Sequence, residues 1–455
     1  MGLRLADALR LTAGGRPTVP APSRVAFVGA GGKTTAMFQL ARQLGGPVIV
    51  STTTHLGAWQ IPLADNHIIA AGIEDLPLEP PAGVTLVTGA RMPAQSADDW
   101  DRFGPVPDAV LLWLHDANAW NRLPLLVEAD GAHRKPLKAP VAHEPVIPPY
   151  MGIVVVVAGL SGLGKPLSEE TVHRPGQFGA LSGLHIGDVV TPEALGVVLA
   201  SAQGGCRGIP AGARRAALLN QADNDSIKAQ ARRMVAALLS EFDAVLVASL
   251  QSEVVHAVHE PVAGIVLAAG GSTRLGRPKV LLDWHGQPFV RAVAISALAA
   301  GLQPVVVVTG PNDDEVSGAL NGLPVSVVHN TAWETGQASS IQAGLRSLPA
   351  TAGAAVFLLA DQPQIGADVI KAIADKHAEG LYPIVAPLIM MERRGNPVLF
   401  DQVTFPELLS LQGDIGGRAV FSRHHVEYVP WYDERLLIDV DTDEDYRRLL
   451  EEDTP

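Results

Sequence analysis

The chain has 455 residues, of which 47% are hydrophobic and 18% charged, and its formal net charge is −13. This length predicts two or three domains, each with enough apolar residues for a core. The acidic charge argues against a long basic groove for nucleic acid, although a glycine-rich loop and one lysine suffice to bind a small phosphorylated ligand.

Cys206 is the only cysteine in the sequence, which excludes an intrachain disulfide and a cysteine-based metal or iron–sulfur site. We expect it to be a small residue that is buried or half-buried. The first residues, MGLRLADALRL, lack the apolar core of a signal peptide, and the longest apolar run, at 153–160, is too short to cross a bilayer. These features predict a cytoplasmic protein without membrane attachment.

Short β-rich runs alternate with helical stretches in the first half of the chain. The runs are uniformly apolar, which indicates strands buried on both faces of a parallel sheet that helices cover. We expect strands at 24–29, 47–51, 84–88, 125–129, 153–158 and 244–249, and helices at 33–44, 192–203 and 226–240.

The segment GAGGKTT lies between the first strand and the first helix. Gly31 and Gly32 let backbone amides approach phosphate oxygens, Lys33 would contact the outer phosphates, and Thr34 would face Mg²⁺. The segment departs from the P-loop pattern GxxxxGK because Phe27 occupies the first glycine position. It predicts a P-loop-like site for a nucleotide with Mg²⁺, with ATP and GTP both open. We expect removal of Lys33 to change stability little.

Three later segments agree with such a site. STTTH (51–55) follows the second strand, where a threonine can sense Mg²⁺. Glu128 and Asp130 end the strand in LLVEADGAHRKPLKAP, as a Walker-B-like carboxylate does. LLNQAD (218–223) is similar to the guanine-reading N-K-x-D of GTP-binding proteins, but Gln221 stands in the lysine position and leaves the base open.

Together, GAGGKTT, STTTH, EADGAHRKPLKAP and LNQAD resemble the selenium-dependent hydroxylase accessory proteins, over about 20–255. The resemblance implies a nucleotide-binding accessory domain that acts in the maturation of a molybdenum hydroxylase, with the apo-hydroxylase as a partner. It implies a pathway more than a reaction. His173 and Arg174 are expected on a helix or loop surface, apart from this site.

The alternation of strands and helices restarts at Gly264, after the polar segment HAVHEP. This restart places a boundary near residue 260 and predicts two α/β domains, over 1–258 and 262–455. In the second domain we expect strands at 304–310, 324–329 and 354–360, and helices at 288–300, 338–347 and 367–379.

The segment LAAGGSTRLGRPK (267–279) leaves the first strand of this domain and is rich in glycine. Its glycines let backbone amides approach phosphate oxygens, and Arg274 and Lys279 add positive charge where a triphosphate needs it. LLADQP places Asp361 just past an apolar strand, where parallel sheets bind ligands. One carboxylate with pyrophosphate oxygens suits Mg²⁺.

Further polar loops follow in an order that supports a nucleotide site. Asn330 and Ser339 lie in HNTAWETGQASSIQAGL, and Asn396 lies in RGNPVLF. Asp439 and Asp441 precede the last helix, in IDVDTDEDYRRLL. Each loop alone is weak evidence, and the prediction rests on their order along the chain.

That order resembles the cytidylyl branch of the molybdenum cofactor nucleotidyltransferases, over roughly 262–450. The resemblance implies a Rossmann-like α/β/α sandwich and CTP as the donor, because LAAG is typical of the CTP-using members and LAGG of the GTP-using ones. It implies Mo-molybdopterin as the acceptor, facing the loops 394–397 and 413–418. Asp361 would hold Mg²⁺, with Asp439 or Asp441 as a second carboxylate. The nucleotide would be held by Leu267, Ala268, Ala269, Gly270, Gly271, Ser272, Lys279, Asn330, Ser339 and Asn396.

In the implied reaction, the terminal phosphate of molybdopterin attacks the α-phosphorus of CTP in line, and pyrophosphate leaves. The nucleophile is already an anion, so catalysis consists of positioning and of charge neutralisation by Mg²⁺, Arg274 and Lys279. Two alternatives stay open. One is nucleotidyl transfer to a sugar phosphate or a polyol phosphate, and the other is a non-catalytic carrier that stores or hands over the cofactor.

Overall fold

The computed structural model describes residues 2–13, 16–17, 23–94, 101–116, 120, 122–270 and 277–452. The chain divides into two compact units, unit 1 (Met1–His259) and unit 2 (Glu260–Pro455). Each unit is an α/β fold on a sheet whose central strands are parallel, which confirms the predicted fold class. Among the described residues, no helix is both long enough and apolar enough to span a membrane.

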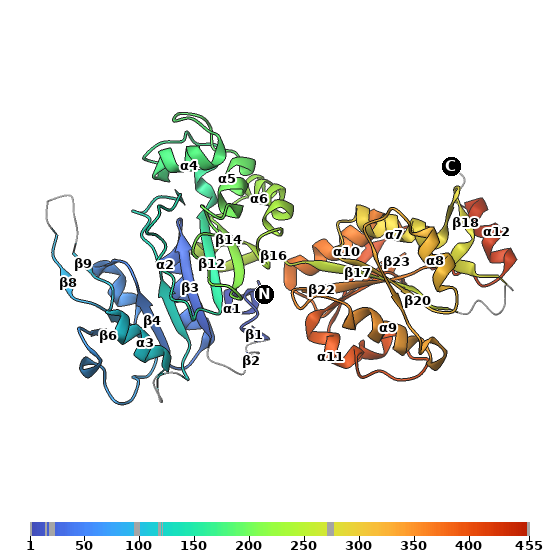
Figure 1. Ribbon diagram of the computed structural model, residues 1–455, viewed down its shortest axis with the longest axis horizontal. Helices are drawn as coiled ribbons and strands as arrows, with labels where there is room; N and C mark the ends of the chain where they lie inside the picture. Colours follow the sequence, from blue (N-terminus) through green and yellow to red (C-terminus); the bar gives the residue numbers. More distant parts are fainter. Residues whose placement is uncertain are drawn as a thin grey trace. The chain divides into compact units, whose positions relative to one another are not determined.

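The described part of unit 1 is built on a nine-stranded sheet in which only the edge strand β16 is antiparallel to its neighbour. Figure 1 labels several of its strands, among them the central strands β3 and β12. Its strands, from edge to edge, are β16 (Val254–His259), β15 (Ala244–Ser249), β14 (Arg214–Asn220), β12 (Ile153–Gly159), β3 (Arg24–Gly29), β10 (Leu125–Glu128), β4 (Val48–Thr52), β7 (Val84–Thr88) and β6 (Asn66–Ile69). The loop after the central strand β3 therefore opens at the carboxyl edge, where parallel sheets bind ligands.

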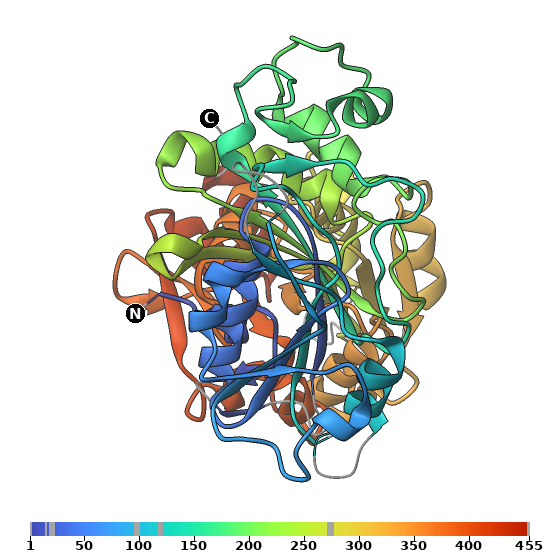
Figure 2. The same cartoon turned by 90° about the vertical axis from the view of Figure 1, so that its left-hand side faces the viewer.

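Helices cover both faces of this sheet (Figure 2). They are α1 (Leu5–Ala8), α2 (Lys33–Leu44), α3 (Asp108–Asp116), α4 (Pro175–Ser182), α5 (Pro192–Ala200) and α6 (Asp225–Leu238). Ala26 and Val28 of β3 share one hydrophobic cluster with α3, α5 and α6, whereas α2 packs on β3, β4 and β10 outside that cluster. Short strands complete the unit: β1 (Thr12–Ala13), β2 (Arg16–Pro17), β5 (Leu56–Gly57), β8 (Arg91–Met92), β9 (Arg102–Phe103), β11 (Leu137–Lys138) and β13 (Val172–His173).

Three strands of the nine-stranded sheet in unit 1, β6, β14 and β16, were not expected from the sequence. Strand β14 reads RRAALLN, and its arginines and alanines lack the β-branched, apolar signal of a buried strand. Strand β16 reads VVHAVH, and its two histidines make the segment look like a polar connection between domains. Its residues alternate in exposure because it is an edge strand that buries one face, so its histidines are compatible with a strand.

Unit 2 contains an eight-stranded sheet whose parallel centre is formed by β21, β20, β17 and β22. Its strands are β21 (Ser326–His329), β20 (Val305–Thr309), β17 (Val262–Ala268), β22 (Ala354–Leu359), β25 (Val398–Asp401), β23 (Ile384–Ile389) and β24 (Arg393–Arg394), with β26 (Val426–Trp431) beside β23. Because β17 and β22 are parallel neighbours, the segments that follow them open at the same edge.

Two hydrophobic clusters lie on opposite faces of this sheet. Val266 of β17 belongs to the cluster with α7 and α10, and its neighbour Ile265 belongs to the cluster with α9 and α11, which gives three layers. The helices are α7 (Phe289–Ala299), α8 (Asp313–Ala319), α9 (Gln337–Arg346), α10 (Ala367–Gly380), α11 (Phe405–Leu408) and α12 (Asp443–Glu452), and a hairpin joins β18 (Asp283–Trp284) to β19 (Gln287–Pro288).

Candidate functional site

In unit 2, Lys279 lies between two carboxylates at the carboxyl edge of the sheet. Its ammonium group pairs with Asp361, which follows β22, and with Asp441 at 3.3 Å. Burial by itself would lower the pKa of Lys279, but the two carboxylates outweigh burial and raise that pKa. Lys279 is therefore a fixed positive charge beside the ends of the central strands.

Asp439 belongs to a separate hydrogen-bonded chain next to this ion pair. Gln362 Nε2 donates to its carboxylate at 2.6 Å, and Asn396 Nδ2 donates to Gln362 Oε1 at 3.2 Å. Burial, followed by repulsion from Asp361 and Asp441, raises the pKa of Asp439. Sequence reasoning missed Gln362, because only its contacts with distant loops distinguish it from any other glutamine.

A cavity of about 510 Å³, here called the lysine pocket, opens beside Lys279. Leu267, Ala269 and Gly270 line it, whereas the side chain of Ala268 is buried. Its other lining residues are Val280, Trp333, Glu334, Thr335, Gly336, Gln337, Ser340, Leu359, Asp361 and Asp414. The candidate residues Gly271, Ser272 and Arg274 lie outside the described residues.

A second cavity of about 480 Å³, here called the arginine pocket, adjoins the first. Its polar lining residues are Gln337, Gln362, Arg393, Arg394, Asn396, Arg418 and Asp439. On its apolar side, Phe357 and Phe400 meet edge to face with ring centroids 5.5 Å apart. Leu267, Gln337 and Leu359 line both pockets, so two ligands bound in them would meet at these residues.

Asn330 and Ser339 hold the loop before α9 in shape. Asn330 is 6% exposed and donates hydrogen bonds to Ser339 Oγ at 2.8 Å and to Ser340 Oγ at 3.0 Å. Ser339 Oγ in turn donates to the carbonyl oxygens of Ala332 and Gly336. The structure thus places both candidate residues inside the loop, where they support the lining residue Ser340 of the lysine pocket.

The GDIGGR segment is fixed against the start of α9. A Cβ on Gly336, whose φ is +111°, would lie 2.4 Å from the carbonyl carbon of Gly413, so only glycine fits. Gln337 N donates to Asp414 Oδ1 at 3.3 Å. Because Gln337 lines both pockets, this contact positions the segment at their common border.

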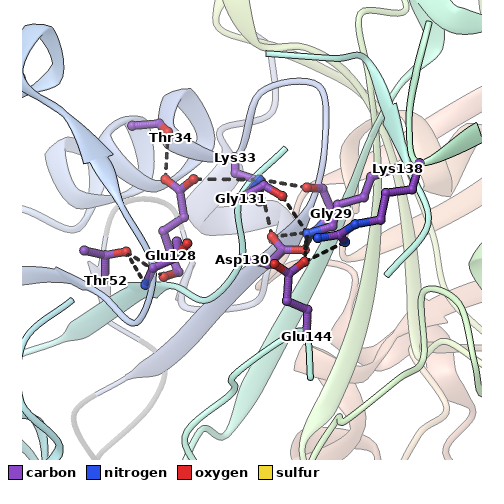
Figure 3. A network of polar contacts seen from close by, with 11 residues as sticks. Gly29, Lys33, Thr34, Thr52, Glu128, Asp130, Gly131, Lys138 and Glu144 are labelled. Carbon is purple, nitrogen blue, oxygen red and sulfur yellow. Dashed lines mark hydrogen bonds and ion pairs between the residues drawn. The ribbon is translucent and has the colours of Figure 1, made fainter. Parts of the chain in front are cut away.

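In unit 1, the lysine and threonine that open α2 face two strand-end acids of β10 (Figure 3). Lys33 Nζ donates to Gly29 O at 2.7 Å and pairs with Asp130 at 3.3 Å and with Glu128 at 3.7 Å. Thr34 Oγ1 donates to Glu128 Oε2 at 2.7 Å. Burial raises the pKa of Glu128, and the charge of Lys33 partly opposes that rise.

The backbone before α2 requires glycine at two positions. Gly31 and Gly32 have φ values of +79° and +128°. A Cβ on Gly31 would lie 2.3 Å from Gly159 N, and one on Gly32 would lie 2.3 Å from Asn220 Nδ2. The loop is therefore packed tightly against the ends of β12 and β14, and a side chain at either position would displace it.

An alternating chain of charges extends from Asp130 away from this loop. Lys138 Nζ is within 2.7 Å of Asp130 and 2.8 Å of Glu144, and Arg174 Nη1 donates to Glu144 at 2.8 Å. Burial by itself would raise the pKa of Glu144, but Arg174 and Lys138 lower it to about 2. Sequence reasoning missed Lys138 and Glu144 as partners of Asp130.

The expectation that His173 and Arg174 lie apart on the surface is wrong. Arg174 binds Glu144, and the ring of His173 stacks on that of His133 with centroids 4.6 Å apart. Burial, then the charges of Arg174 and the neighbouring cations, lowers the pKa of His173 to about 4. A sequence cannot reveal this contact, because β11 and β13 pair side by side only in the folded chain.

Among the described residues, no group of three or more histidine, cysteine or acidic side chains converges in a way that could hold a metal ion by itself. The acids of each site instead face a lysine, through Asp361 and Asp441 in unit 2 and through Glu128 and Asp130 in unit 1. A divalent cation at either site would therefore need phosphate oxygens and water as further ligands.

Comparison with known proteins separates the two halves. Residues 264–428 match the MobA-like NTP transferase domain, and residues 25–176 match the YqeC protein family. The YqeC protein of Escherichia coli (strain K12) is 32% identical over 211 residues, which cover 45% of this chain and 77% of that protein.

The second half is similar to proteins with other names. The "Probable molybdenum cofactor guanylyltransferase" of Bacillus cytotoxicus is 28% identical over 204 residues, which cover 42% of this chain and 96% of that protein. A crystal structure of Rv0371C from Mycobacterium tuberculosis in complex with manganese is 30% identical and covers 42% of this chain and 98% of that chain, with a TM-score of 0.36.

Proposed function

Because this chain joins a YqeC-family half to a MobA-like nucleotidyltransferase half, we propose that unit 2 transfers CMP from CTP to the terminal phosphate of Mo-molybdopterin. Pyrophosphate is the second product. Unit 1 binds a nucleoside triphosphate and acts as an accessory domain in the maturation of a molybdenum hydroxylase, whose apo form is a partner.

The observation that carries this proposal is the pair of adjoining pockets in unit 2. The lysine pocket and the arginine pocket share Leu267, Gln337 and Leu359, and each has the volume that a small ligand needs. Lys279 and Asp361 line the lysine pocket, and Asp439 lines the arginine pocket. A nucleotide in one pocket and an acceptor in the other would therefore meet at the shared residues, as two reacting substrates must.

The chemistry of the arginine pocket fits a flat ring that carries a phosphate. Phe357 and Phe400 offer an apolar wall, and Asn396 and Gln362 offer amide groups near it. The three arginines of the pocket supply guanidinium groups, which bind phosphate in a bidentate manner. A pterin with a terminal phosphate has both features.

The acids beside Lys279 are two carboxylates, and carboxylate oxygens are ligands that Mg²⁺ prefers. Asp361 and Asp441 both contact the ammonium group, so a divalent ion bound with a triphosphate would find two carboxylates there. Asp439 is bonded to Gln362 and lines the other pocket, which supports Asp441 as the second ligand. The ion would supply charge neutralisation at the phosphates.

The residues of the chain have clear tasks in the transfer. The LAAGG backbone holds the triphosphate, and Lys279 compensates the charge that builds on the leaving pyrophosphate. The arginine pocket aligns the acceptor phosphate, whose oxygen forms the new bond to the α-phosphorus as the bond to pyrophosphate breaks. The acceptor is already an anion, so no residue has to remove a proton.

In unit 1, Gly31, Gly32, Lys33 and Thr34 support binding of a nucleoside triphosphate with Mg²⁺. The loop backbone is set by its glycines, Lys33 is close enough to turn toward a phosphate, and Thr34 with Glu128 can hold the ion. Asp130 pairs with Lys33 in this structure, and a bound phosphate would compete for that lysine.

Acceptor-dependent release of pyrophosphate tests the proposal for unit 2. The full chain is mixed with CTP and Mg²⁺, with and without Mo-molybdopterin, and pyrophosphate is measured. We expect release only when the acceptor is present. Binding of both ligands without any release would show a carrier, and release with a sugar phosphate or polyol phosphate instead would assign a different acceptor.

A further inference from the structure

Asn220, at the end of β14, connects the glycine-rich loop of unit 1 to the loops that follow β14 and β15. The side chain is 4% exposed. Its Nδ2 donates to Gly31 O at 2.7 Å, and its Oδ1 accepts from Leu250 N at 3.0 Å. The phosphate-facing loop is therefore held at a fixed distance from these two loops.

The charges around β3 determine on which side of the loop a nucleoside can lie. On the β10 side, the strand ends are filled by Glu128 and Asp130, with Lys138 buried against Asp130. On the β12 side, Gly159 touches Gly31 with no side chain between them. A sugar and base attached to phosphates at this loop would therefore extend over β12 toward β14 and β15.

Asp223 lies in the loop after β14, three positions after Asn220. It is exposed, and its charge, like that of Asp225, acts on His256 of β16, where it opposes the lowering of the His256 pKa by burial. The backbone on either side of it is anchored. Ala222 N donates to Ala248 O at 3.0 Å, and Asn224 caps α6 by accepting from Ile227 N at 3.0 Å.

The residue in the lysine position of the N-K-x-D pattern has a role of its own. Gln221 has a φ of +66°, and its Oε1 accepts a hydrogen bond from Ser161 Oγ at 2.6 Å. The glutamine thus secures the turn to the segment after β12. Replacing lysine by glutamine at this position does not change the two other polar residues of the pattern. Asn220 can still anchor the glycine-rich loop, and Asp223 can still contact a base.

We propose that unit 1 selects guanine, with the Asp223 carboxylate accepting hydrogen bonds from N1–H and from the 2-amino group. An ionised carboxylate is an acceptor only, and guanine is the base whose pairing edge offers two adjacent donors. Adenine and cytosine place a ring acceptor beside their amino group, and uracil offers one donor between two carbonyls. This inference rests on the proposed binding of nucleotide by Lys33 and Thr34.

Base selection by Asp223 can be tested with xanthine, a base that differs from guanine on its pairing edge. Xanthosine triphosphate carries a carbonyl at C2 where GTP carries an amino group, so an amide at position 223 would pair with it in place of guanine. Calorimetry on the full chain with Mg²⁺ would give the affinities for GTP, ATP and xanthosine triphosphate. Lys33→Gln keeps a donor toward Gly29 O but removes the charge. Once circular dichroism and an unfolding curve show that this variant is folded, its titration identifies the heat that comes from unit 1.

We expect the site that depends on Lys33 to bind GTP about tenfold or more tightly than ATP. Asp223→Asn should lose that preference and bind xanthosine triphosphate instead. Asp225→Asn is the matched control, because Asp225 is a neighbouring, 99% exposed acid on the same segment and should leave GTP binding unchanged.

Two outcomes would contradict the inference in different ways. The first is binding that depends on Lys33 but has equal affinity for GTP and ATP, or that still prefers GTP in Asp223→Asn. Either result would overturn the guanine assignment alone. Complete absence of binding that depends on Lys33 would overturn the proposed nucleotide site of unit 1, and the guanine assignment with it.

Discussion

Asp361 follows β22, and its carboxylate contacts the ammonium group of Lys279 in the lysine pocket. We predict that Asp361→Ala lowers the rate of nucleotidyl transfer by about a thousandfold or more, because the triphosphate loses its main carboxylate-held cation. Initial rates of pyrophosphate release would measure the effect. Asp375→Ala, which removes an exposed acid from α10, is the control that should keep full activity. A variant of Asp361 with more than a tenth of the wild-type rate would exclude the residue from this role.

Ala269 contributes a methyl group to the lysine pocket at the position where the GTP-using relatives are expected to carry glycine. Its side chain is 7% exposed and lines the pocket, so the methyl group limits the space for a base. We predict that Ala269→Gly reduces the preference for CTP over GTP by about tenfold, the range that one methyl group provides. The ratio of the two kcat/KM values is the measurement. An unchanged ratio would remove Ala269 from base selection.

Lys33 shows where reasoning from the sequence was incomplete at the scale of one residue. We expected its removal to change stability little, because a lysine in a glycine-rich loop packs little apolar surface. In the structure it is 5% exposed and neutralises Glu128 and Asp130, which are themselves buried. Removing one partner of a buried ion pair lowers the free energy of unfolding by about 3–5 kcal/mol. A loss of nucleotide binding in Lys33→Ala could therefore result from unfolding rather than from the missing phosphate contact.

At the scale of elements, Glu144 connects the loop after β10 with the start of α4. It accepts charge-assisted hydrogen bonds from Lys138 and from Arg174. Its pKa in the folded protein, about 2, is below its ordinary value of 4.5, so the folded state binds the proton less tightly than the unfolded chain. The carboxylate therefore stabilises the fold above pH 4.5, and this contribution is lost as the pH falls toward 2.

We predict that Glu144→Gln lowers the free energy of unfolding by about 1–2 kcal/mol near neutral pH, after allowance for solvent screening. Urea unfolding of the wild type and the variant would show this difference, and the difference should shrink as the pH falls below 4.5. Glu169→Gln, at an exposed acid nearby in the sequence, should show neither effect. A difference between wild type and Glu144→Gln that does not depend on pH would indicate lost packing rather than lost charge.

The strands of both units show which structural features a sequence pattern can predict. Strands such as β3, β12 and β17 were predicted because they are uniformly apolar, and glycine-rich phosphate-binding loops were predicted at the carboxyl ends of β3 and β17. The contacts between those ends were not predictable. Gln362 with Asn396, and Asp130 with Lys138, join loops whose proximity depends on strand order, which local periodicity does not contain.

At the scale of the whole molecule, motif spacing identified two families in one chain, and the comparisons confirm both. GAGGKTT and LAAGGSTRLGRPK carry that recognition because each combines glycines with a lysine directly after a buried strand. The sequence did not reveal that unit 2 has two adjoining pockets, since their walls come from loops as distant as Leu267 and Arg418. That division into two pockets is the basis for assigning one ligand to each.

Unit 2 is proposed to join CMP to the molybdopterin phosphate through a new phosphoanhydride bond. The most direct test gives the full chain equimolar CTP, GTP, ATP and UTP together with Mo-molybdopterin and Mg²⁺, and determines the products by mass spectrometry. We predict one dominant product, the cytosine dinucleotide form of the cofactor, formed in equal amount with pyrophosphate. A guanine dinucleotide as the main product, or no nucleotide attached to the pterin phosphate, would show that unit 2 is not a molybdopterin cytidylyltransferase.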